Sequence, residues 1–337
     1  MLDNAASVDY KKLHADALVW DAHSCLPLSP EVDITVLQRH HESGVDFLSI
    51  NVGMDMNPLV DIIQIIASFR RQIAALDDQF IQVVGIDDVR RAKREGKMAI
   101  AFDLEGSVML DNAPDMVDLF YHLGVRQIHL AYNRNNVVGG GCHDEDIPLS
   151  ALGHRMVAAI NKAGMLMDCS HTGYRTSMDV MAASSKPVIF SHSNPKALVD
   201  HPRTITDEQI RSCAATGGVI GINGVSLFLN DPEATPETIF RHIDYVAELV
   251  GPAHVGLGID YEYELGIDDA PAGLDRNHWW PPEDGYSAES GIQEIVITAP
   301  EQIPRLTQLM LDHGYSEQHI RDILGLNFMA VAEKSWV

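Results

Sequence analysis

Residues 165–193 read MLMDCSHTGYRTSMDVMAASSKPVIFSHS and contain the pattern from which the rest of the chain can be interpreted. Two short apolar runs, Met165–Asp168 and Val188–Ser191, are each followed closely by a histidine. Runs of this length that are rich in apolar and β-branched residues indicate buried strands, and the long connection between them suits a crossover between parallel strands. The stretch therefore predicts one unit of an α/β fold.

The same pattern recurs along the whole chain. Eight runs qualify as strands: Ala17–Asp21, Asp46–Asn51, Met98–Leu104, Arg126–Ala131, Met165–Asp168, Val188–Ser191, Val219–Asn223 and Val255–Ile259. Amphipathic stretches lie between them, among them Leu59–Leu76, Ala113–Leu123, Gly153–Ala163, Thr206–Thr216 and Pro236–Leu249. Strands that alternate with helices predict a parallel sheet, and eight such units match a (β/α)₈ TIM-like barrel. Phe80–Val84 is a competing apolar run that would spoil the count of eight.

Length and composition favour one large core. The chain has 337 residues, of which 46% are hydrophobic, and it contains no internal repeat or linker that would divide it. We expect residues 1–337 to form a single metal-dependent hydrolase barrel domain. The acidic, Pro-rich and aromatic segment 261–298 would follow the last strand, as a loop over the active-site mouth or as ordinary loop packing.

Bulk charge and sequence patterning exclude several classes of partner. A formal net charge of -24 disfavours nucleic acid and anionic membrane surfaces. No window has the eighteen or more apolar residues of a membrane span, and the first residues lack the features of a signal peptide, so we expect a cytoplasmic protein. The four cysteines, Cys25, Cys142, Cys169 and Cys213, include no CxxC pair and are expected to be reduced.

Polar residues follow the predicted strands where a barrel gathers its active site. In a parallel barrel the residues past the carboxyl ends of the strands converge on one pocket. The candidates are Asp21, His23 and Cys25, then Asp103 and Glu105, then Tyr132 and Asn133, then Asp168 and His171, then His192, and finally Asp260. Imidazole, carboxylate and thiolate groups together suit a zinc site. We set His129 aside, because it lies inside its predicted strand.

These motifs, in this order, resemble the renal-type (membrane) dipeptidases of the amidohydrolase superfamily over nearly the whole chain. The matching pieces are DCSH ending at His171, PVIFSHS with His192, HPRTITDEQIR with Arg203, GGVIGIN, and VGLGIDYE with Asp260. The two histidines are 21 residues apart, from 171 to 192. The resemblance implies a barrel hydrolase that binds one or two zinc ions per chain and acts on a dipeptide, and by analogy with the family a homodimer is expected.

The resemblance also assigns roles to individual positions. Glu105 stands where the family has a glutamate that bridges two zinc ions, and His171 with His192 match the ligands of the second ion. His23 matches the histidine of a His-x-Asp pair that holds the first ion. Asp260 matches the aspartate that passes a proton from the attacking hydroxide to the leaving amine. Arg203 matches the arginine that pairs with the carboxylate of the substrate.

Two positions depart from the family pattern. Cys25 stands in place of the aspartate of His-x-Asp, and Tyr132 stands in place of a histidine that polarises the substrate. Cys25 could ligate zinc as a thiolate, could fill space and leave the first metal site weak or empty, or could act as a nucleophile, although no motif places a base beside it. Tyr132 can donate a hydrogen bond to a developing oxyanion but cannot carry positive charge.

Three functions therefore remain open. The first is zinc-dependent hydrolysis of a dipeptide or similar small amide by a metal-activated water. The second keeps the fold and metal but changes the substrate to an N-acyl amino acid or another amide that is not a dipeptide. The third is a catalytically degenerate barrel that binds a small peptide or metabolite, which would be stabilised by ligand without forming product.

Overall fold

The computed structural model describes residues 8–287 and 295–336, and its centre is a ring of parallel strands. The strands are β1 (Trp20–Cys25), β2 (Phe47–Met54), β4 (Met98–Glu105), β5 (Val125–His129), β6 (Leu166–Asp168), β7 (Val188–Ile189), β8 (Ile220–Ile222) and β9 (Val255–Leu257). They are hydrogen-bonded in the order β7-β6-β5-β4-β2-β1-β9-β8. A parallel bridge between Phe190 and Ile220 joins β7 to β8 and closes the ring. The predicted (β/α)₈ TIM-like barrel and its eight strands are confirmed.

The competing run at Phe80–Val84 is also a strand, but it does not change the count. Strand β3 (Phe80–Gln82) pairs with the first residues of β4, from Met98 to Ile100. Strand β5 pairs with β4 farther along, from Phe102 to Leu104. Strand β10 (Tyr261–Glu262) likewise pairs with the end of β1, beyond the point where β9 pairs with Asp21. Short strands thus share an edge with a longer neighbour.

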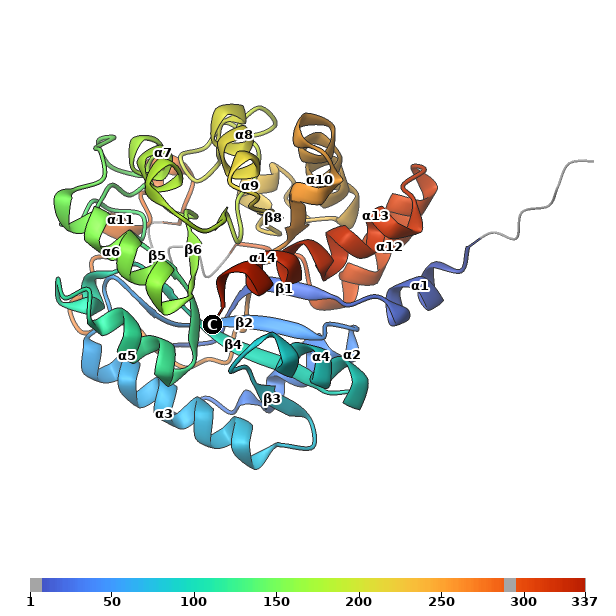
Figure 1. The fold of residues 1–337 in the computed structure, drawn as a ribbon, viewed down its shortest axis with the longest axis horizontal. Helices are drawn as coiled ribbons and strands as arrows, with labels where there is room; N and C mark the ends of the chain where they lie inside the picture. The colour runs from blue at the N-terminus through green and yellow to red at the C-terminus, as the bar shows by residue number, and fades with distance from the viewer. Residues whose placement is uncertain (1–7, 288–294, 337) are drawn as a thin grey trace, which may run out of the picture.

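Helices surround this ring (Figure 1). They are α1 (Tyr10–Asp16), α2 (Gln38–Glu42), α3 (Leu59–Ala75), α4 (Ile86–Glu95), α5 (Met116–Leu123), α6 (Ala151–Ala163), α7 (Tyr174–Ala183), α8 (Asp207–Ala215), α9 (Ser226–Leu229), α10 (Pro236–Val250), α11 (Arg276–Trp279), α12 (Ile303–Asp312), α13 (Glu317–Arg321) and α14 (Asn327–Ser335). Figure 1 shows α3 and α5 on one side of the strands and α7, α8 and α10 on the other. Within residues 8–287 and 295–336, no helix has the length and apolar character that would let it cross a membrane.

Local sequence explains where these helices start and which face they bury. In α3 the buried residues Ile62, Ile65, Ile66, Phe69 and Ile73 recur at the spacing of one helical face, which packs on the barrel. Helix α8 begins with a capping box in which the side chains and backbone amides of Thr206 and Gln209 bond reciprocally. The five helices expected from sequence are confirmed, with ends that shift by at most a few residues.

An aromatic cluster closes the amino-terminal end of the barrel. Trp20 and Phe47, at the starts of β1 and β2, stack with ring centroids 3.5 Å apart. Phe328 of α14 stacks on Trp20 from the other side, and Trp336 packs against the same ring. All three of Trp20, Phe47 and Phe328 are buried. Side chains therefore fill this end of the barrel, and the predicted site lies at the opposite end, at the carboxyl ends of the strands.

Candidate active site

A single carboxylate oxygen lies at the centre of the site. Glu105 is the last residue of β4, and its Oε1 lies 3.0 Å from His171 Nε2, 3.5 Å from His192 Nε2, 3.5 Å from His23 Nε2 and 3.8 Å from His129 Nδ1. In the described part of the chain this buried oxygen has no hydrogen-bond partner. A buried polar atom without a partner is costly, so this arrangement calls for a cation between the oxygen and the imidazoles.

His171 and His192 present their Nε2 atoms to each other at 2.9 Å. His171 Nδ1 lies 2.7 Å from Asn133 Oδ1, and because an amide oxygen only accepts, this contact fixes the proton on Nδ1 and leaves Nε2 as a bare lone pair. His192 Nδ1 lies 2.6 Å from the Ser191 hydroxyl. Ligand atoms of a tetrahedral zinc ion lie about 3.3 Å apart, so the Glu105, His171 and His192 atoms have the spacing of a ligand set.

A second group of possible ligands surrounds His23. Residues 23 and 25 lie on the same face of β1, and Cys25 Sγ is 3.5 Å from His23 Nε2. Asp260 Oδ1 is also 3.5 Å from this nitrogen. Burial raises the pKa of the Cys25 thiol, although the neighbouring His23 opposes the shift. Imidazole and carboxylate donors therefore stand on both sides of Glu105, with the Cys25 sulfur on the His23 side, a donor set that fits one or two zinc ions.

Carboxylates behind the imidazoles orient them. Asp103 Oδ1 lies 3.2 Å from His23 Nδ1, and Asp168 Oδ2 lies 2.6 Å from His129 Nε2. Burial works against charge on both histidines, but the adjacent carboxylates outweigh it and raise the pKa of each imidazole. The ion pair with His129 lowers the pKa of Asp168 to about 2 in spite of its burial. Such outer carboxylates fix ring orientation in metal sites.

His129 was excluded from the predicted site because it was expected to lie inside its strand, and the structure shows that this expectation was wrong. Its strand was expected to run to Ala131, but β5 ends at His129 itself. The side chain therefore stands at the carboxyl end of the strand and joins the cluster around Glu105. Strand β1 differs in the opposite sense, because it continues to Cys25 rather than ending at Asp21. His129 was overlooked because the predicted end of its strand was two residues too late, at Ala131 instead of His129.

Asp260 and Arg203 stand beside the cluster. Asp260 follows β9 with a left-handed backbone (φ 61°), and Asn223 Nδ2 donates to its Oδ2 at 2.8 Å. Burial raises the pKa of Asp260, while the positive charges of His23 and Arg203 oppose the rise. The buried Arg203 donates from Nη2 to the His192 carbonyl at 3.2 Å and lies over the Phe228 ring. It lines the pocket, and no other hydrogen bond from its guanidinium to residues 8–287 or 295–336 is found.

Tyr132 packs directly against a predicted metal ligand. Its ring stacks on His171 with centroids 4.4 Å apart, and its hydroxyl accepts a hydrogen bond from Trp280 Nε1 at 3.1 Å. The buried Asp55 accepts from the Tyr132 amide at 3.0 Å and holds the backbone. Burial and the charge of Glu105 raise the pKa of the phenol well above its usual value. Tyr132 thus keeps its proton and can donate it in a hydrogen bond.

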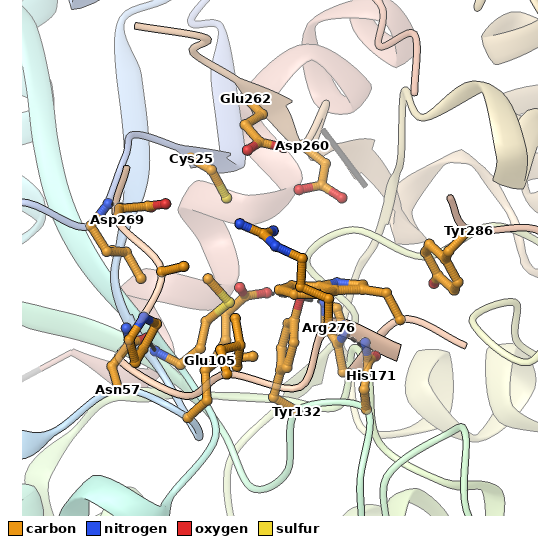
Figure 2. Close-up of a pocket in the computed structure, with 18 of the residues that line it drawn as sticks. Cys25, Asn57, Glu105, Tyr132, His171, Asp260, Glu262, Asp269, Arg276 and Tyr286 are labelled. Atoms are coloured by element: carbon orange, nitrogen blue, oxygen red, sulfur yellow. Dashed lines mark hydrogen bonds and ion pairs between the residues drawn. The ribbon is translucent and has the colours of Figure 1, made fainter. Parts of the chain in front are cut away.

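The predicted residues come together around one pocket at the open end of the barrel (Figure 2). Cys25, Glu105, Tyr132, His171, Arg203 and Asp260 line it, and the fully buried His23 and His192 lie behind Glu105. None of the eight lies elsewhere.

The segment expected over the mouth contributes to the same pocket. Asp269, Leu274, Arg276, Trp280 and Tyr286 from the predicted loop 261–298 line it, whereas residues 288–294 of this loop lie outside the described residues. Sequence reasoning also missed Glu262 in this segment. Burial and the carboxylates of Asp260 and Asp269 raise its pKa to about 7.

Comparisons with known proteins show similarity to dipeptidases. Residues 11–281 match the sequence pattern of the family described as Membrane dipeptidase (Peptidase family M19). "Dipeptidase tcpJ" of Claviceps purpurea is 29% identical over 337 residues, which cover 98% of this chain and 69% of that protein. "Uncharacterized dipeptidase C965.12" of Schizosaccharomyces pombe is 33% identical over 66% of this chain, and the match spans 55% of its length. The crystal structure of an amidohydrolase from Pseudomonas aeruginosa superposes with a TM-score of 0.87 at 27% identity, covering 98% of this chain and 99% of that one.

Proposed function

Because the chain belongs to the membrane dipeptidase family, we propose that it hydrolyses a dipeptide or a closely similar small amide, with zinc as its metal. Membership confirms the family predicted from sequence and makes the chain a hydrolase of the metallopeptidase type. The residue roles below are part of the proposal. The observation that carries it is the orphaned Glu105 oxygen, which four imidazole nitrogens surround beneath the pocket.

The proposed ligands of the tightly held zinc ion are Glu105, His171 and His192, and His23 and Cys25 flank a second, weaker site on the other side of Glu105. Zinc held there would lower the pKa of a water molecule to near neutrality and polarise the amide carbonyl. His171 and His192 suit this role because burial and the charge of Arg203 keep both imidazoles neutral, and only a neutral imidazole has a lone pair to donate.

Asp260 is proposed to move the proton. Its carboxylate lies at the edge of the ligand cluster, 3.5 Å from His23 Nε2, and Asn223 holds it from the opposite oxygen. As a general base it would accept a proton from the attacking water, and it would then return that proton to the nitrogen of the departing amine. The raised pKa of Asp260 helps a carboxyl group to serve in both directions.

Arg203 and Tyr132 are proposed to hold the substrate. The guanidinium of Arg203 is buried at the pocket wall, where it can bind the carboxylate of the substrate through two parallel hydrogen bonds. Tyr132 would donate its hydroxyl proton to the carbonyl oxygen as negative charge develops there. The Trp280 hydrogen bond supports this role, because it occupies an acceptor position on the phenol and leaves the proton to point elsewhere.

A substrate panel on purified protein tests the proposal. Dipeptides with L- and D-residues at the second position are compared with N-acyl amino acids, using the parent and Asp260→Asn. We expect dipeptide hydrolysis that Asp260→Asn abolishes, while Asp312→Asn at an exposed position of α12 keeps it. Hydrolysis that survives in Asp260→Asn would remove this residue from the mechanism. Binding of the panel without product would favour a degenerate barrel.

A further inference from the structure

Opposite charges stand on two sides of the pocket, and the reacting groups lie between them. Both Arg203 and Glu262 line the pocket, but Arg203 follows β7 and Glu262 lies beside β1, three positions away in the ring of strands. We propose that the Glu262 carboxylate binds the α-ammonium group of the substrate, so that a free amino terminus is what the site selects. This inference rests on the proposed function and deepens it, because it separates dipeptides from N-acyl amino acids.

The position of Glu262 follows from the strand pairing. Strand β10 extends the barrel wall beside the end of β1, and Glu262 is the register partner of Cys25. Figure 2 shows its carboxylate on the same side of the pocket as Cys25 and Asp260. The side chain therefore reaches the cavity next to the ligand cluster, and it also borders a second hollow lined by Val36 and Arg39.

The Glu262 carboxylate has no partner within residues 8–287 and 295–336, where no hydrogen bond or ion pair to it is found. Its neighbour Asp269 differs, because Asp269 Oδ2 already accepts from the Leu28 amide at 2.7 Å. Asp260 is likewise held by Asn223. Among these three carboxylates, Glu262 is the one for which neither oxygen accepts a hydrogen bond from the described residues.

The surroundings of Glu262 favour a positively charged ligand. Asp260, Asp269 and Glu264 all add negative charge around it, and Arg276 of α11 opposes them without forming an ion pair with Glu262 in the described ranges. A partly buried carboxylate among like charges is unfavourable until a cation pairs with it. An ammonium group supplies a compact charge with three hydrogen-bond donors, whereas the amide of an N-acyl group supplies no charge.

The opposite side of the pocket completes the match to a zwitterion. Arg203 leaves the loop after β7, and Glu262 lies beside β1, with β8 and β9 between these strands in the ring. The charge of Arg203 acts on Asp260, which follows β9 and lies in the same pocket. A dipeptide bound with its carboxylate at Arg203 would place its amide over the cluster and direct its amino terminus toward Glu262.

The experiment compares one dipeptide with its own N-acetyl derivative. The dipeptide that the panel shows to be hydrolysed fastest is used, and kcat and KM are measured for the parent, Glu262→Gln and Glu264→Gln. Glu264 is exposed, is two residues away on the chain and serves as the matched control. Zinc content and Tm are recorded for each protein, because they report a lost ligand or a folding defect independently of activity.

We expect Glu262→Gln to lower kcat/KM for the free dipeptide about 10- to 100-fold, mostly through KM, and to leave kcat/KM for the N-acetyl form nearly unchanged. Glu264→Gln should behave like the parent. An equal loss for both substrates, an unchanged preference, or loss of zinc from Glu262→Gln would overturn the inference and leave the proposed function standing. Hydrolysis of neither substrate by the parent would overturn both.

Discussion

His129 Nε2 lies 2.6 Å from Asp168 Oδ2, while the other ring nitrogen of His129 faces Glu105 Oε1 at 3.8 Å. Both side chains are fully buried, so this ion pair is shielded from water beneath the candidate metal ligands. Asp168 also accepts from the backbone amides of Ser170 and Ser191, which precede His171 and His192. One carboxylate thus connects three of the four imidazoles around Glu105.

This connection predicts an effect of Asp168→Asn on metal binding. We expect the affinity for zinc to fall about 10- to 100-fold, because the neutral amide no longer fixes His129 and the loops that carry His171 and His192. Competition with a chelating dye measures the dissociation constant. Asp118→Asn is the control, since Asp118 forms an exposed pair with His122 on α5. Equal zinc affinity in Asp168→Asn and the parent would contradict the prediction.

Cys25→Asp should change the number of metal ions. Burial favours the protonated thiol, whereas a carboxylate at position 25 would be a ready ligand beside His23. We expect one tightly held zinc per parent chain and two per variant chain, measured by plasma mass spectrometry on protein purified without chelator. Cys25→Ser, which adds no carboxylate, should match the parent. Two ions in the parent would instead mean that Cys25 or a neighbouring residue completes the site beside His23.

Tyr132→Phe should affect turnover more than substrate binding. Loss of an oxyanion hydrogen bond typically lowers kcat by about 100-fold or more, while KM changes little because the bond forms in the transition state. Steady-state kinetics on the best dipeptide measure both constants. Tyr245→Phe is a suitable control, since the Tyr245 hydroxyl bonds Asp207 between helices α8 and α10. A kcat close to that of the parent would show that another group stabilises the oxyanion.

His242 should make stability depend on pH. It is buried in α10, and burial together with the charge of Arg241 lowers its pKa to about 4. Between about pH 6.5 and pH 4 the unfolded chain binds a proton here that the folded chain does not, so the free energy of unfolding falls as pH falls, by up to about 3 kcal/mol. Urea unfolding of His242→Leu should show a flatter pH dependence, and exposed His122→Leu should not.

Gly258→Ala should destabilise the barrel wall behind His192. A Cβ atom at Gly258 would lie 1.9 Å from the Ser191 carbonyl oxygen, a contact that backbone atoms cannot relieve without moving. We expect a loss of about 1–3 kcal/mol in thermal or urea unfolding. Gly85→Ala is the control, because no atom lies within 4 Å of its added Cβ and only a small capping effect of at most about 1 kcal/mol is expected. Similar stability of the two variants would refute the close contact.

The sequence predicted the ring of strands because each barrel strand is buried on both sides and reads as a continuous apolar run. It also placed Glu105, His171 and His192 near one another, since their positions follow strand ends. It could not reveal Glu262, because that carboxylate reaches the pocket only through the pairing of β10 with β1. Nor could it assign His129, whose inclusion depends on where β5 ends.

The strands of the barrel wall are unequal in length, and this difference affects where the wall can open locally. Strands β1, β2 and β4 span six to eight residues, whereas β6 to β9 span two or three, and a single bridge from Phe190 to Ile220 joins β7 to β8. Backbone hydrogen bonds from Phe190 to Val219, Gly221 to Phe190 and Ser193 to Gly221 cross this seam, and His192 stands directly beside it. An ion bound by both His192 and Glu105 would connect the short strands β6 to β9 with the long strands β1, β2 and β4 across the ring. The metal ion proposed for catalysis would then also stabilise the closed barrel wall.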